Sequence, residues 1–79
     1  MDYRIEYQRC EIYVSSSDPL MLSEKFSALN DEEAKKKYNV FVREKEANRD
    51  KDEYDYKEYP IRLVRIIEPE KVLELAKTE

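Results

Sequence analysis

Hydrophobic and polar positions alternate at the start of the chain, but the alternation shifts once. The apolar residues form two sets of opposite parity: Tyr3, Ile5 and Tyr7, then Cys10, Ile12 and Val14. No turn-forming residue separates the sets, which favours one strand over two. We expect a β-bulge at Gln8–Arg9 that returns both sets to one face of a single long, bent strand.

A turn and a weaker strand follow. Residues 15–19 have the sequence SSSDP, whose side chains bond their own backbone or fix φ, so they predict a turn. Over residues 20–29, Leu22, Phe26 and Ala28 are expected to share one face of a second strand.

The pattern then changes to a helical one, predicted over residues 31–47. Asn30 can cap the helix while Glu33 reaches back to it. Helical spacing produces one apolar stripe, in which Lys45 takes part through its aliphatic stem. The stripe consists of Ala34, Tyr38, Phe41, Val42 and Lys45.

The last third of the chain begins with a charged segment, residues 47–58, that has almost nothing to bury and is expected to be a solvated connection. Residues 59–67 predict a third strand that is apolar on both sides. Residues 68–70, EPE, are expected to begin a short C-terminal helix. Its apolar side would comprise Val72, Leu73, Leu75 and Ala76.

These elements predict a single α+β domain over residues 1–79, with the order β-β-α-β-α. A crossover through the main helix returns the third strand parallel to the second. The first strand then lies between them, which gives a three-stranded sheet of order 2-1-3. The main helix covers one face, and the short helix is too small to cover the other. Part of the sheet should therefore stay open or pair with another chain.

Composition narrows the chemistry that such a domain can perform. The 79 residues include no His, no Gly and one Cys, so histidine-based nucleophiles, glycine-rich phosphate loops and cysteine zinc clusters are excluded. A domain of this size buries a small core and leaves little room for a deep pocket. We expect no catalytic residues, no metal and no cofactor. No apolar segment is long enough to span a membrane, and the lone cysteine is typical of a cytoplasmic protein.

The first candidate site is the acidic, tyrosine-rich part of the charged segment. The residues expected to contact a partner are Asp52, Glu53, Tyr54, Asp55, Tyr56 and Glu58. Spaced carboxylates can imitate phosphates, and tyrosines anchor interfaces, so the segment could occupy a basic, nucleic-acid-binding surface. The alternative is a solvated loop whose tyrosines lean on the sheet edge.

The second candidate is the open sheet face. We expect it to display mixed charges, with Arg4, Tyr13 and Arg62 as the residues that could contact a nucleic acid. The net charge of −4 opposes phosphate binding, so direct nucleic-acid binding is disfavoured. The alternatives are a ladder of Arg–Glu pairs between strands, or a symmetric dimer. The other residues expected on this face are Glu6, Arg9 and Glu11, with Arg65 as the alternative to Arg62 in the third strand.

The sequence therefore predicts a non-enzymatic, regulatory binding protein that occupies a partner's surface. Its size, its lack of motifs and its acidic segment fit an accessory protein of a phage or mobile element. Two alternatives remain: a single-strand nucleic-acid-binding module that uses the sheet face, and a structural subunit of a larger complex. In a structural subunit, the residues that dock on the complex would be Val72, Leu73 and Leu75.

Overall fold

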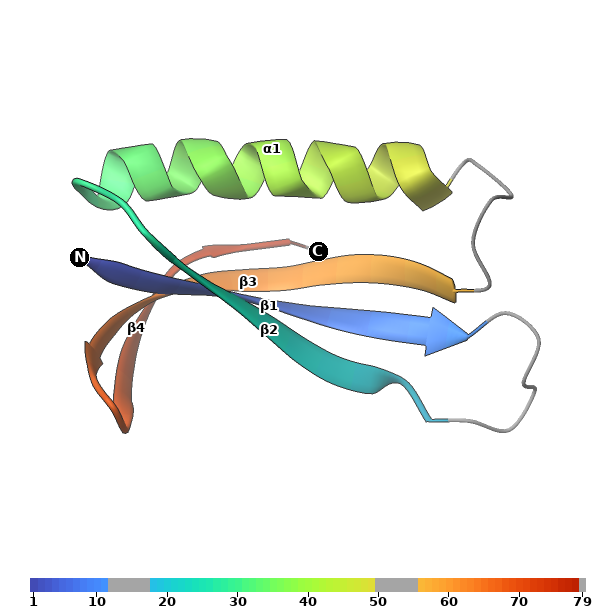
Figure 1. The fold of residues 1–79 in the computed structure, drawn as a ribbon, viewed down its shortest axis with the longest axis horizontal. Coiled ribbons are helices and arrows are strands. Elements are labelled where there is room, and N and C mark those ends of the chain that lie inside the picture. The colour runs from blue at the N-terminus through green and yellow to red at the C-terminus, as the bar shows by residue number, and fades with distance from the viewer. Residues whose placement is uncertain (12–17, 50–55, 79) are drawn as a thin grey trace.

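The computed structural model describes residues 1–11, 18–49 and 56–78. Their elements in chain order are β1 (Asp2–Glu11), β2 (Leu20–Ser27), α1 (Asp31–Arg49), β3 (Tyr56–Glu68) and β4 (Lys71–Lys77). The strands form an antiparallel sheet of order β2-β1-β3-β4, and α1 lies along one face of it (Figure 1). The α+β class and the strand order 2-1-3 are confirmed within this larger sheet. The expected count of three strands is wrong.

The additional strand is β4, where the sequence predicted a short helix. Residues 69 and 70 form a tight turn instead, and Glu68 pairs with Lys71 across it. The reason lies in β3, a strand of 13 residues that would otherwise leave one side of its backbone unpaired. An antiparallel partner bonds those N–H and C=O groups, which a helix could not do. Pairing with β3 in this hairpin therefore overrides the local helical spacing.

The bulge is also located differently from the prediction. β1 pairs with β2 in continuous register from Asp2 to Arg9, so the expected bulge at Gln8–Arg9 is absent from that ladder. The irregularity lies between β1 and β3, where Glu6 pairs with Arg62 and Tyr7 pairs with Pro60. Ile61 is therefore the extra residue. Because side chains alternate along a strand, one extra residue changes which parity of β3 faces α1.

The helix follows local rules closely. Asn30 Oδ1 accepts a hydrogen bond of 2.8 Å from the backbone N–H of Glu33, which confirms the predicted cap. Acidic side chains occupy the first turn, where the helix dipole favours them. A Lys37–Glu33 ion pair of 3.6 Å adds support at i,i+4 spacing. The helix ends at Arg49, two residues later than predicted. The connection before β3 is therefore shorter than the expected 47–58.

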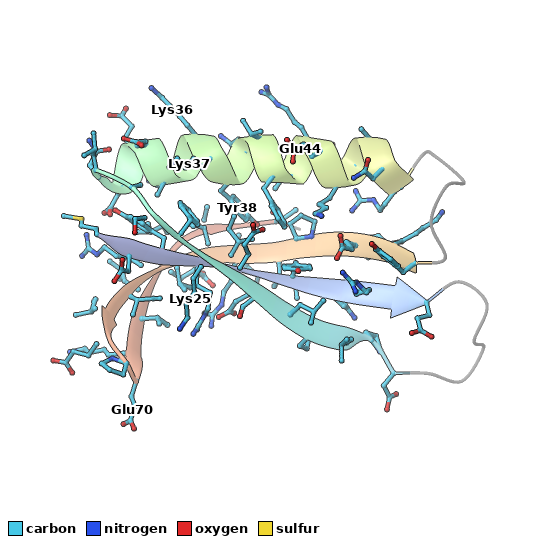
Figure 2. All side chains as sticks on the ribbon, in the orientation of Figure 1. Lys25, Lys36, Lys37, Tyr38, Glu44 and Glu70 are labelled. Carbon is cyan, nitrogen blue, oxygen red and sulfur yellow. The ribbon has the colours of Figure 1, made fainter. Side chains whose placement is uncertain are left out.

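The core lies between α1 and the sheet, where Figure 2 places Tyr38. Its buried residues are Tyr3, Ile5, Ala28, Ala34, Tyr38 and Leu63. Two aromatic contacts extend it: Tyr3 stacks on Phe26 with ring centroids 5.6 Å apart, and Tyr7 meets Phe41 at 5.4 Å. The Tyr38 hydroxyl hydrogen-bonds Thr78, which fixes the end of the described chain to the helix. The core is small, as expected for a chain of this length.

A large-to-small change at Leu63 tests this core. Leu63 is fully buried, so Leu63→Ala is expected to lower the free energy of unfolding by about 2–4 kcal/mol, measured by urea denaturation. Leu63→Met, which keeps the volume, should cost less than about 1.5 kcal/mol. The matched control is Leu29→Ala, because Leu29 is 83% exposed and its loss should change stability by less than about 0.5 kcal/mol. Equal losses at the two leucines would contradict the assigned core.

Candidate functional site

The acidic segment enters the described part of the chain only at its end. Asp52, Glu53, Tyr54 and Asp55 lie outside the described residues. Tyr56 and Glu58 belong to β3, at the edge of the molecule where α1 also ends (Figure 1). The structure therefore describes how the segment is attached to the fold.

Glu58 is the centre of this attachment. It is 8% exposed and accepts bonds from two cations of different elements. Lys45 Nζ of α1 lies 2.6 Å from Glu58 Oε1, and Arg9 Nη2 of β1 lies 2.8 Å from Oε2, with Nε at 3.1 Å. One carboxylate thus joins α1, β1 and β3. A buried carboxylate needs such partners, because an unpaired charge is costly to remove from water.

These bonds also set the charge state of Glu58. Burial by itself would raise the pKa of the carboxyl group, but the hydrogen bonds from Lys45 and Arg9 outweigh it and hold the pKa below its usual value. Glu58 is therefore ionised at neutral pH. A general acid requires the opposite shift, so this carboxylate is suited to attachment and not to proton donation.

Two tyrosines beside Glu58 also contact basic side chains, through cation–π interactions. The Arg9 guanidinium lies 4.1 Å from the centre of the Tyr56 ring, and the Arg49 guanidinium lies 4.6 Å from that of Tyr59. Arg49 Nη1 also donates to the backbone carbonyl of Glu58 at 3.0 Å. We call this group the anchor cluster; it consists of Arg9, Lys45, Arg49, Tyr56, Glu58 and Tyr59.

The sequence did not identify the anchor cluster. It grouped Glu58 with solvated carboxylates and expected Arg9 on the open sheet face, whereas Arg9 faces α1 because β1 carries no bulge. One signal was available: Lys45 already belonged to the apolar stripe of the helix. A carboxylate on the opposing sheet stabilises the charge of a lysine on the buried side of a helix.

On the open face, the two candidate arginines are already paired with acidic side chains. Glu6 accepts from Arg4 Nη2 at 2.8 Å and from Arg62 Nε at 2.5 Å. The hydrogen bond from Arg62 contributes most to holding the pKa of Glu6 below its usual value. Arg62 also lies 3.5 Å from Glu74 of β4. Tyr13, the third candidate, lies outside the described residues. The observed arrangement is the ladder of Arg–Glu pairs that the sequence offered as the alternative.

A further ion pair uses Arg65, which lies on the helix side. Arg65 Nη1 contacts Asp31 Oδ2 at 2.9 Å, and the buried Tyr3 hydroxyl donates to Asp31 Oδ1 at 2.8 Å. Asp31 is the first residue of α1, so these bonds fix the start of the helix to β1 and β3. Their role is structural.

In the described ranges, no three His, Cys, Asp or Glu residues are grouped so that they could hold a metal ion. The α1 helix is too polar to cross a bilayer. A small groove of about 110 Å³ borders the anchor cluster. Its lining residues are Lys45, Asn48, Arg49, Tyr56, Lys57 and Glu58.

Comparisons with known proteins give no relative. No protein-family model matches the chain, and neither the search of curated proteins nor that of solved structures found a match.

The ion pairs of Glu58 predict how the stability of the fold depends on pH. Glu58→Gln removes the charge while keeping the shape, and it should lower the free energy of unfolding at pH 7 by about 1–2 kcal/mol. Because the folded-state pKa of Glu58 is lowered, its contribution is fully present above the ordinary pKa of 4.5 and is lost as the pH falls through the folded-state value. The difference between wild type and Glu58→Gln should therefore shrink in acid, as measured by urea denaturation across a pH series.

The control for this prediction is Glu44→Gln, which removes the same charge from an exposed position of α1. It should leave stability nearly unchanged at every pH. If the difference in free energy of unfolding between wild type and Glu58→Gln stays constant down to pH 3, the loss does not come from the ionised form of the carboxylate.

Proposed function

We propose that this chain is a non-enzymatic, cytoplasmic binding protein, of the accessory kind found in phages and mobile elements. It acts by occupying a basic surface of a nucleic-acid-binding protein with its acidic, tyrosine-rich segment. The contact residues are assigned to the part of the segment that precedes the anchor cluster. They are Asp52, Glu53, Tyr54 and Asp55, with Tyr56 at the boundary.

The observation that carries this proposal is the fixation of both ends of the segment. The helix ends at Arg49 and β3 begins at Tyr56, and the two are joined through Glu58. Arg49 bonds the Glu58 carbonyl while Lys45, one turn earlier, bonds its carboxylate. A segment whose ends are already held loses less conformational entropy on binding than one with free ends.

Charge supports the same conclusion. Residues 50–55 have the sequence DKDEYD, with four carboxylates against one lysine. Such a density of negative charge steers the segment toward a positive surface and discriminates against neutral ones. Tyr54 adds an aromatic side chain of the type enriched at the centre of interfaces.

The role of Glu58 changes from the one that its sequence suggested. It was grouped with the contacting carboxylates, but its side chain is buried and bound by two cations. In this proposal it is a positioning residue. The contacting charges are those of Asp52, Glu53 and Asp55.

A charge reversal tests the proposal. The triple variant Asp52→Lys, Glu53→Lys and Asp55→Lys is immobilised beside wild type and exposed to lysate of the source cells. Wild type should retain a basic protein that added duplex DNA or high salt displaces, because DNA competes for the same surface. The triple variant should retain roughly tenfold less of it, or none, since like charges now oppose each other.

The matched control is Glu44→Lys, Glu46→Lys and Glu70→Lys, which changes the net charge equally at exposed positions of α1 and of the β3–β4 turn. Figure 2 shows Glu70 at the tip of that turn, directed away from the sheet. This variant should bind as wild type does. Equal binding by all three proteins, or equal loss in both variants, would refute a role for this segment in particular.

A further inference from the structure

The sheet has two edges, and they differ in how regular they are. The pairing of β4 with β3 shifts register twice, and lysines stand at both ends of β4, at positions 71 and 77. Bulges and lysines are the means by which proteins prevent edge strands from pairing with other chains. The other edge, β2, pairs with β1 in continuous register from Leu20 to Ser27 and carries no bulge. It is the regular edge of the sheet.

The direction of the β2 backbone groups follows from one hydrogen-bonded pair. Met1 and Ala28 exchange both bonds, at 3.1 and 3.2 Å. In an antiparallel ladder, bonded and non-bonded pairs alternate, so the even-numbered residues of β2 bond β1. The odd-numbered residues direct their N–H and C=O groups outward. They are Met21, Ser23, Lys25 and Ser27. Consistent with this direction, the Ser27 carbonyl accepts a bond from Lys37 Nζ at 3.1 Å.

Apolar side chains are exposed along the same edge. Leu20 is 56% exposed and Met21 is 61% exposed. The helix packs mainly on β3, and its Lys37 contacts Phe26 and Ser27 at the C-terminal end of β2. On the side of α1 nearest β2, Val40 is 52% exposed beside a groove of about 210 Å³ that Phe26 also lines. Exposed apolar residues thus lie at the start of this edge and on the helix side nearest to it.

The charge of β2 favours a second copy of the chain as the partner. The whole chain carries −4, so two copies repel each other over most surfaces. β2 contains one acidic and one basic residue, Glu24 and Lys25, and is neutral. Two β2 strands therefore meet without a net charge of either sign.

The geometry points to β2 as a dimerisation strand, paired antiparallel with β2 of a second copy to continue the sheet across a two-fold axis. The N–H and C=O groups that point away from β1 belong to odd-numbered residues. Odd-numbered residues of one β2 strand must therefore pair with odd-numbered residues of the other. Two registers with this parity overlap most of the strand. One places Glu24 opposite Glu24 of the second copy, which is unfavourable. The other places Ser23 on the axis.

The register with Ser23 on the axis sets each remaining pair. Met21 lies opposite Lys25 of the second copy, Leu22 opposite Glu24, and Leu20 opposite Phe26. No like charges are directly opposed. Met21 and Lys25 project to the face away from α1, where Figure 2 shows Lys25. A change of charge at Met21 therefore acts on Lys25 of the second copy, and it does so twice because of the symmetry.

The test is sedimentation equilibrium of wild type, Met21→Glu and Met21→Lys, over concentrations that reach millimolar. Wild type should show a reversible monomer–dimer equilibrium. Met21→Glu should tighten the dimer by roughly 2- to 30-fold, and Met21→Lys should weaken it by a similar factor, since two cross-strand pairs change in each case. The increase with Met21→Glu is diagnostic, because added negative charge otherwise favours the monomer. Thermal unfolding of each variant checks that the monomer fold is retained.

The matched controls are Leu73→Glu and Leu73→Lys on the other edge, where Leu73 is 43% exposed. The dimer affinities of the two Leu73 variants should not differ from each other in the way that those of the two Met21 variants do. A wild type that stays monomeric throughout, a shift of both Met21 variants in one direction, or a dimer that responds at Leu73 instead would each overturn the proposal. The outcome is independent of the acidic segment, because none of these variants changes residues 50–58.

Discussion

The extra residue at Ile61 determines which side chains of β3 meet α1. Before it, the even-numbered residues Glu58 and Pro60 face the helix; after it, the odd-numbered Leu63 and Arg65 do. Without the irregularity, one of these pairs would turn to the open face, and either the core would lose Leu63 or the anchor cluster would lose Glu58. Core packing and attachment of the acidic segment therefore depend on one local change of parity.

That parity also explains the distribution of charge. At the start of α1, Asp31 is paired with Arg65 of β3, and in its C-terminal half Lys45 is paired with Glu58 of β3, so an ion pair joins each half of the helix to the sheet. The Asp31–Arg65 side chains are 35% and 30% exposed, and the Glu58 carboxylate is 8% exposed. Such pairs contribute modestly to net stability but restrict how the helix lies on the sheet.

The start of α1 was predicted correctly from residues that are close together in the sequence. Asn30 caps α1 because its side-chain oxygen accepts a hydrogen bond from an N–H three residues away. The errors concerned partners in other strands and in the helix. Residues 71–77 are helical by spacing, but β3 needed a strand beside it. Glu58 has the composition of a solvated residue, and only the parity set at Ile61 brings it opposite Lys45. Neither requirement is visible in a local window.

The two proposed interfaces use different elements, and their combination has a geometric consequence. Pairing through β2 leaves β3 and the end of α1 untouched, so binding at the two places should be nearly independent. Antiparallel β2 strands point in opposite directions, which sets the two anchor clusters at opposite ends of the dimer. Two acidic segments so placed cannot converge on one small basic site, since the linked sites must be within reach to raise the effective concentration. A dimer would therefore join two partner molecules instead of binding one of them twice.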